Sequence, residues 1–242
     1  MNREYHKWYS PHLGREMELL IFGHAGAKVL IFPTRCARFY EYEQLGLVNA
    51  LSAKINDGQL QLYCLDSIDA ETFYCDWNWP GDRIRRHLQY EEYILNEVFP
   101  LMRLKNAHHC TISHGCSFGA FQAVNIAFRH PHLFQKVAAL SGRYDLTQPV
   151  DGFRGLFDGY YDDLVYFNTP SHFVPNLSND STLHHMRQMD IVMAIGEHDP
   201  FLDNNRNLSA TLWSKGVWNA LHVWNGRAHS ASPWRKMVPL YV

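Results

Sequence analysis

The order of strand-like and helix-like segments is the feature that most narrows the folds open to this chain. Short runs rich in apolar and β-branched residues predict eight strands, at residues 4–9, 16–22, 28–32, 60–65, 109–113, 136–140, 190–195 and 222–224. Short turns join the first three, whereas longer segments separate the later ones. Hairpins followed by βα units predict an α/β sheet that is mostly parallel, with an antiparallel amino-terminal edge and helices on both faces.

The segments between the later strands have the length and pattern of helices. We predict helices at residues 41–56, 83–103, 119–129 and 204–215. No internal repeat and no Pro/Gly/Ser-rich linker interrupts the chain. With 242 residues and 46% hydrophobic content, the chain can bury one sizeable core. We therefore expect residues 1–242 to form a single domain.

The charge pattern excludes several classes of partner. The formal net charge is -2, and no long run of one sign is present, so we expect no nucleic-acid and no membrane partner. The amino terminus is too polar for a secretory signal, and no apolar run reaches membrane-spanning length. We expect a cytoplasmic protein that acts on a small molecule, and its composition is compatible with a homo-oligomer.

Cysteines and histidines show no metal-binding spacing. The five cysteines form no C-x-x-C pair, and the fifteen histidines include no pair at helical i, i+4 spacing within a zinc motif. We expect reduced thiols, no metal and no cofactor.

One pentapeptide carries a recognisable chemical pattern. Residues 115–119 read G-x-S-x-G between the fifth predicted strand and the helical stretch that follows it. A serine on a tight strand-to-helix turn has its hydroxyl lifted clear of the sheet and within reach of a base. Ser117 is therefore the candidate nucleophile. The alternatives are a glycine-rich turn without chemical role and a serine that caps the helix.

A serine nucleophile needs a base, and the base needs an orienting carboxylate. Asp199 follows the seventh predicted strand and His229 follows the eighth. The carboxyl ends of parallel strands meet at one edge of a sheet, so we expect these side chains to lie near Ser117. The order Ser, Asp, His is the order found in α/β hydrolases.

Nearby residues of the same types compete for these roles. Asp203 is the rival of Asp199 and could instead cap the helix that follows it. His198 and His222 are the rivals of His229. Cys116, beside the candidate nucleophile, is expected to point away from the substrate.

The chain resembles the esterases of the esterase D and antigen 85 type within the α/β hydrolases. The resemblance covers nearly the whole chain and rests on short motifs, at residues 32–34, 115–119, 130–134, 141–142, 196–200 and 229–234. It implies an α/β-hydrolase fold and a serine hydrolase that cleaves carboxylic esters through an acyl-enzyme. Two departures are Cys36-Ala37-Arg38, where relatives often have a glycine, and Ala120, where a second glycine is frequent.

The same resemblance implies an oxyanion hole. One donor is the backbone N–H of Phe118, which follows the nucleophile, and the other comes from the turn at residues 34–36. By analogy with the family we assign the second donor to Arg35. The departure at Cys36 leaves the other N–H groups of this turn open as donors.

Two aromatic-rich segments, residues 66–79 and 153–173, lie on the side of the sheet where functional loops are expected. We predict that Asp66, Ser67 and Trp77 contact substrate. Aromatics packed under long loops are the alternative. The mixture of aromatic and polar residues, without a long aliphatic stretch, favours short acyl chains.

The sequence thus predicts a serine esterase without a cofactor. An acyltransferase that uses the same triad is one alternative. A catalytically silent hydrolase fold that serves as a binding protein is another, because fold does not guarantee activity.

Overall fold

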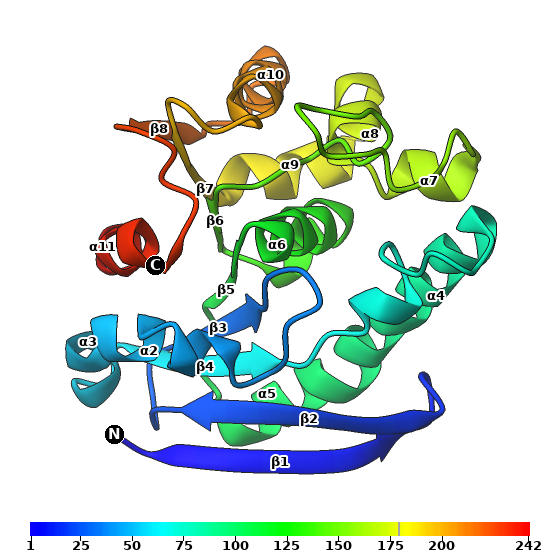
Figure 1. Ribbon diagram of the computed structural model, residues 1–242. Helices are drawn as coiled ribbons and strands as arrows, with labels where there is room; N and C mark the ends of the chain where they lie inside the picture. The colour runs from blue at the N-terminus through cyan, green and yellow to red at the C-terminus, as the bar shows by residue number, and fades with distance from the viewer. Residues whose placement is uncertain (179) are drawn as a thin grey trace.

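A computed structural model describes residues 1–178 and 180–242, and in this part of the chain eight strands form one sheet (Figure 1). The strands are β1 Arg3–Ser10, β2 Arg15–Phe22, β3 Ala27–Phe32, β4 Leu60–Leu65, β5 Thr111–Cys116, β6 Lys136–Leu140, β7 Asp190–Gly196 and β8 Ala220–Trp224. Their order across the sheet is β1-β2-β4-β3-β5-β6-β7-β8. The β1–β2 and β2–β4 pairs are antiparallel, and the remaining pairs are parallel. The predicted sheet, with its antiparallel amino-terminal edge, is confirmed.

The position of each strand explains its composition. The central parallel strands β3 and β5 are covered on both faces, so nearly every residue in them is buried. Strand β1 lies at the edge of the sheet, and its charged and aromatic residues alternate between exposed and half-buried positions. Charged residues on an edge strand disfavour pairing with another sheet.

Helices cover both faces of the sheet (Figure 1). On one face lie α4 Pro80–Tyr93, α5 Phe99–Lys105, α6 Phe118–Arg129, α8 Pro170–Asn176, α9 Asp180–Gln188 and α10 Leu202–Ser214. On the other lie α1 Glu41–Gln44, α2 Leu47–Ala50, α3 Ser52–Asn56 and α11 Ala231–Tyr241. Each face has its own apolar cluster against the sheet, so the sheet is the central layer of three.

Two predicted helices differ from the observed ones. The segment 41–56 is divided into α1, α2 and α3: Gly46 takes a left-handed conformation with φ 74° between α1 and α2, and Leu51, with φ −97° and ψ 6°, leaves helical geometry between α2 and α3. The segment 83–103 extends to 80–105 and contains a π-helical turn, Ile94–Val98. Pro100 follows this turn and has no N–H for a helical hydrogen bond, a common cause of such irregularity.

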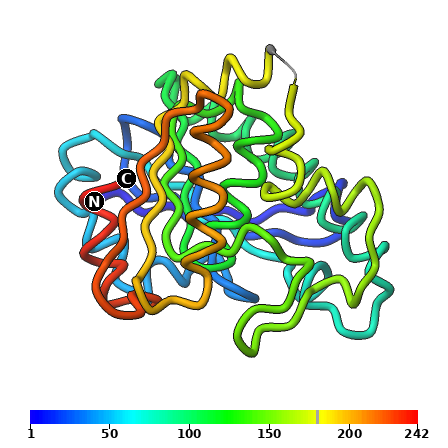
Figure 2. Tube along the Cα trace, turned by 90° about the horizontal axis from the view of Figure 1, so that it is seen from above, coloured from blue at the N-terminus to red at the C-terminus, as the bar shows by residue number. Residues whose placement is uncertain are grey.

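Two long loops meet beyond the carboxyl ends of the parallel strands. One comprises residues 66–79, and the other runs from residue 141 to α7 Asp163–Phe167 (Figure 2). The ion pair of Arg154 with Asp76 joins them, and a second ion pair, of Arg83 with Asp158, ties the longer loop to α4. In residues 1–178 and 180–242, no helix is both long and apolar enough to cross a membrane.

Candidate active site

Ser117 occupies a sharp turn between β5 and α6. Its backbone has φ 56° and ψ −121°, a combination that most residues avoid. The turn requires glycine on both sides. A Cβ on Gly115 would lie 2.2 Å from the backbone of Gly119, and a Cβ on Gly119 would lie 2.4 Å from the carbonyl oxygen of Phe32. The two glycines of the pentapeptide therefore allow α6 to start directly against the sheet.

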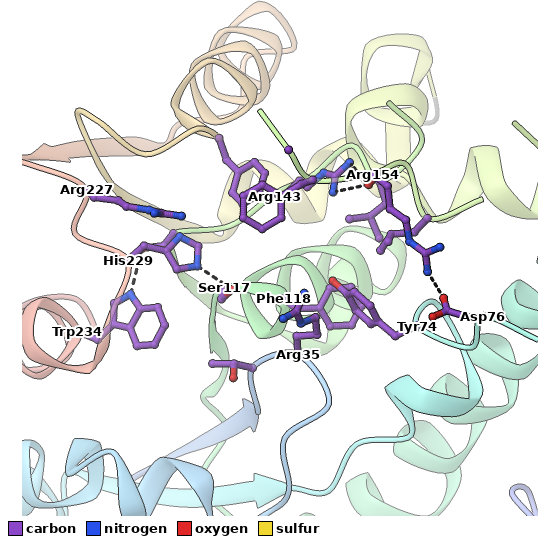
Figure 3. Close-up of a pocket in the computed structure, with 17 residues that line it drawn as sticks. Arg35, Tyr74, Asp76, Ser117, Phe118, Arg143, Arg154, Arg227, His229 and Trp234 are labelled. Carbon is purple, nitrogen blue, oxygen red and sulfur yellow. Dashed lines mark hydrogen bonds and ion pairs between the residues drawn. The ribbon is translucent and has the colours of Figure 1, made fainter. Parts of the chain in front are cut away.

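Ser117, His229 and Asp199 form a continuous hydrogen-bonded chain, and Figure 3 shows its link between Ser117 and His229. His229 Nε2 lies 2.8 Å from Ser117 Oγ, and His229 Nδ1 lies 2.7 Å from Asp199 Oδ2. A carboxylate only accepts hydrogen bonds, so Nδ1 carries the ring proton and Nε2 is left to accept the serine hydroxyl. Asp199 is buried, and its Oδ1 also accepts the N–H of Phe201.

The loop that carries His229 is held by its neighbours. Buried Ser141 donates its hydroxyl to the carbonyl of Ala228 at 3.1 Å and accepts the indole N–H of Trp234 at 3.0 Å. A Cβ on Gly196 would meet the carbonyl of Arg227 at 2.1 Å, so the loop lies directly on the end of β7. These contacts fix the imidazole relative to the serine.

The rival residues lie elsewhere. Asp203 is exposed and pairs with Arg206 on α10. His198 is exposed, and exposed His222 stacks on Tyr241. Cys116 is buried at the end of β5, where burial raises the pKa of its thiol well above the ordinary value. Ser117 lies at the amino end of α6, yet its side chain makes no capping hydrogen bond.

Two backbone N–H groups beside Ser117 have no acceptor in the described residues. In the turn after β3, the Thr34 N–H donates to Glu41 and the Cys36 N–H donates to Asp69 Oδ2 at 2.8 Å. The N–H of Arg35, between them, is unengaged within the described chain. The N–H of Phe118 opens α6 and has no intrahelical acceptor. These are the two donors predicted for an oxyanion hole.

Cys36 occupies a backbone conformation in this turn that is rare for residues other than glycine. It adopts the left-handed conformation, with φ 56°, that glycine would take without strain. Asp69 holds it there from a fully buried position. Burial raises the pKa of Asp69 from its ordinary 3.8 to about 7, against the hydrogen bonds from Cys36 and Gln122.

A cavity of about 570 Å³ opens over Ser117 (Figure 3). Its walls come from the loops after β3, β4, β5, β6, β7 and β8, and the described residues that line it are Thr34, Arg35, Tyr74, Asp76, Ser117, Phe118, Ser141, Arg143, Leu146, Gly152, Phe153, Arg154, Leu156, Phe201, Arg227, His229 and Trp234. Such a volume suits a small-molecule ligand.

The three residues predicted to contact substrate, Asp66, Ser67 and Trp77, do not line this cavity, and their contact with substrate stays a prediction. Asp66 is buried behind the turn after β3 and accepts hydrogen bonds from Arg38 and the Phe39 N–H. Ser67 donates to the carbonyl of Ala37 at 2.7 Å, bracing the same turn. Trp77 is 82% exposed and borders a separate, shallower hollow beside α4.

Both loops contribute to the cavity, through residues that the sequence analysis did not name. Tyr74 and Asp76 come from the first loop, and Phe153, Arg154 and Leu156 from the second. Sequence reasoning also missed Arg143 and Arg227. Arg143 follows Ser141-Gly142 and Arg227 precedes His229 by two residues, so their position beside recognised motifs was the available signal.

No cluster of three or more His, Cys, Asp or Glu side chains suited to a metal ion occurs in the described part of the chain.

Comparison with known proteins places this geometry in a family. A model of the family described as "Putative esterase" matches residues 45–237. No protein of curated function matches. Solved structures that resemble the chain include a ferulic acid esterase, with a TM-score of 0.77 at 15% identity, covering 98% of this chain and 95% of that one.

Two bacterial structures are similar over the same extent. The S-formylglutathione hydrolase of Staphylococcus aureus aligns with a TM-score of 0.71 at 14% identity, over 98% of this chain and 94% of its own. Mycobacterium tuberculosis MPT51 aligns with a TM-score of 0.73 at 14% identity, over 99% and 96%. At this identity the likeness shows the fold, and the predicted α/β-hydrolase fold is confirmed. Because the family model spans most of the sequence, the chain belongs to this esterase family and is a carboxylic ester hydrolase.

Proposed function

We propose that the chain hydrolyses small carboxylic esters through an acyl-enzyme on Ser117, with His229 as general base and acid and Asp199 as the residue that orients it. The observation that carries this proposal is the hydrogen-bonded chain from Ser117 Oγ through the imidazole to the buried carboxylate. It lies at the floor of a cavity large enough for a small ester.

The chemistry follows from the donor and acceptor pattern. Ser117 Oγ attacks the ester carbonyl carbon while His229 Nε2 takes the hydroxyl proton, which gives a tetrahedral oxyanion. Asp199 stabilises the imidazolium through Nδ1–H. When the intermediate collapses, His229 returns the proton to the leaving alkoxide and the alcohol departs. Water then attacks the acyl-enzyme with His229 again as base, releasing the acid and restoring the serine.

The backbone N–H groups of Phe118 and Arg35 are the proposed oxyanion donors. Both belong to residues that line the cavity with Ser117, and neither has an acceptor among the described residues, so neither needs to break a hydrogen bond to receive the developing charge. Loss of one such donor typically lowers kcat by about 10²- to 10³-fold. A backbone donor is independent of side-chain identity, which fits an arginine at position 35.

We further propose short acyl chains. The described residues that line the cavity include Leu146, Leu156 and Phe118, which belong to one apolar cluster, but also four arginines and Asp76, so the lining is mixed rather than uniformly aliphatic. An aliphatic slot would gain about 0.8 kcal/mol per added methylene. Measured kcat/KM across acetyl, butyryl, octanoyl and palmitoyl esters tests this, and a steady rise toward palmitoyl would refute it.

The triad is tested by kinetics on 4-nitrophenyl acetate with matched controls. Ser117→Ala is expected to lower kcat by about ten-thousandfold or more, whereas Cys116→Ala retains activity. His229→Ala is likewise inactive, and His198→Ala and His222→Ala retain activity. An active Ser117→Ala enzyme would refute the assignment.

Product analysis with the wild-type enzyme distinguishes the remaining functional classes. Addition of a competing alcohol acceptor should leave free acid as the main product, because water is the proposed acceptor. Preferential formation of a new ester would make the chain an acyltransferase. Absence of turnover on every ester would leave a binding protein on a hydrolase fold.

A further inference from the structure

The wall of the cavity over Ser117 is rich in arginine. The described residues that line it include four arginines, Arg35, Arg143, Arg154 and Arg227, and one carboxylate, Asp76 (Figure 3). Asp76 is paired with Arg154. Within the described chain, none of the other three guanidinium groups forms an ion pair with a carboxylate. A partly enclosed site lined by charges of one sign concentrates ligands of the opposite sign.

Two of these arginines, Arg35 and Arg143, lie within electrostatic range of one tyrosine, Tyr74. The Arg35 guanidinium lies 5.5 Å from the centre of the Tyr74 ring. Burial raises the pKa of Tyr74 and the negative charge of Asp69 adds to that rise, whereas the positive charges of Arg35 and Arg143 act against it, so all three charged groups lie within electrostatic range of its hydroxyl. That hydroxyl has no hydrogen-bond partner among the described residues, although it belongs to the cavity wall. An O–H donor is therefore free beside two cations.

Arg143 is fixed in place by neutral groups. It is 7% exposed and donates to the carbonyls of Asp145, Gln148 and Arg154, while its guanidinium lies 5.6 Å from the centre of the Phe201 ring. Carbonyls and an aromatic face hold the guanidinium, and the Asp145 carboxylate, which acts on it electrostatically, is hydrogen-bonded to Thr147 and His172 rather than to Arg143. A buried cation without a carboxylate partner is costly unless an anion approaches it.

We infer that this cavity selects esters that carry an anionic group, such as a carboxylate, which is bound by the Arg35 guanidinium and the Tyr74 hydroxyl in the field of Arg143. The inference rests on the proposed esterase chemistry at Ser117 and adds the charge class of the substrate. Arginine suits this role because its fork of N–H donors matches the two oxygens of a carboxylate.

Matched ester pairs test the charge preference. A charged acyl group is provided by mono-4-nitrophenyl glutarate, with 4-nitrophenyl valerate as its neutral counterpart. A charged alcohol is provided by 4-acetoxybenzoate, with 4-acetoxybenzamide as its neutral counterpart. We expect kcat/KM for the anionic member to exceed that of the neutral member by about tenfold or more in at least one pair, a factor typical of a hydrogen bond to a charged group.

Substitutions in the cavity wall identify the side chains that create the preference for anionic esters. Arg35→Gln keeps the backbone N–H but removes the guanidinium, and Tyr74→Phe removes only the hydroxyl. Each is expected to lower the ratio of anionic to neutral kcat/KM by about fivefold or more. Arg206→Gln is the matched control, because it removes an exposed arginine on α10 that pairs with Asp203 outside the cavity. It should leave the ratio unchanged.

The outcomes separate this inference from the proposed function. Hydrolysis of the neutral esters that depends on Ser117, without preference for the anionic member of either pair, would overturn the inference alone. An anionic preference that Arg35→Gln and Tyr74→Phe both leave intact would also overturn it. Failure to hydrolyse any ester would instead overturn the proposed function.

Discussion

Replacement of Asp69 by asparagine should change how stability depends on pH. Asp69 is fully buried, and the amide oxygen of an asparagine at this position could still accept the Cys36 N–H that the carboxylate accepts at 2.8 Å. The variant therefore keeps the hydrogen bond and removes the ionisable group. Burial raises the pKa of Asp69 from 3.8 to about 7, so the folded protein holds this proton over a range in which the unfolded chain has lost it.

The sign and size of the effect follow from this difference. Between about pH 4 and pH 7 the folded state binds more protons at this site, so the contribution of Asp69 to stability falls as pH rises and is constant above about pH 7. The rise in pKa corresponds to about 4 kcal/mol in total. From about pH 5 to about pH 8, Asp69→Asn should gain about 2.5 kcal/mol relative to wild type.

Urea denaturation of wild type and Asp69→Asn at both pH values measures this quantity. The comparison cancels other titrating groups, including buried His87 and His114, whose pKa values burial lowers to about 4. A difference in unfolding free energy between the two proteins that stays constant within about 0.5 kcal/mol would refute the reasoning, because a carboxylate with a raised pKa must contribute a slope.

Three further substitutions test the geometry of the site. Asp69→Ala leaves the Cys36 N–H without its acceptor, so kcat should fall about tenfold or more with little change in KM. Asp69→Asn keeps an acceptor and should retain activity. Equal kcat values in the two variants would contradict the role of Asp69 in positioning the turn that carries the Arg35 N–H. Gly119→Ala places a Cβ 2.4 Å from the Phe32 carbonyl oxygen and should lower the free energy of unfolding by about 2 kcal/mol or more in denaturant titrations; wild-type stability would contradict the close approach. Trp77→Ala should change kcat/KM by less than about twofold, because the side chain is exposed and outside the cavity; a tenfold fall would place it in substrate binding.

The sheet was predictable from sequence because buried parallel strands appear as short apolar runs, as in β3 and β6. The helices were less predictable. One glycine, Gly46, divides the predicted helix 41–56, and α11 contains two prolines that weaken its helical pattern. Such local irregularities do not change the order of β and α segments, so the predicted sheet topology was still correct.

The candidate site also has a part that could be predicted from sequence and a part that could not. Ser117, Asp199 and His229 stand at strand ends, and the sheet brings strand ends together whatever the loops do. The cavity wall depends instead on how two long loops pack on each other, as in the ion pair of Arg154 with Asp76. No local pattern encodes that approach. Asp66, Ser67 and Trp77 therefore lie on a loop that contributes to the cavity but do not line it themselves.

Labelling with a fluorophosphonate tests the central claim most directly, because the probe reacts with a serine only when a neighbouring base activates it. The bond forms between the serine oxygen and phosphorus, and fluoride leaves. Intact-mass and peptide-mass spectrometry should show one adduct on Ser117 in wild type, none in Ser117→Ala, and strongly slowed labelling in His229→Ala. An adduct on another residue, or equal labelling of Ser117→Ala, would contradict the account.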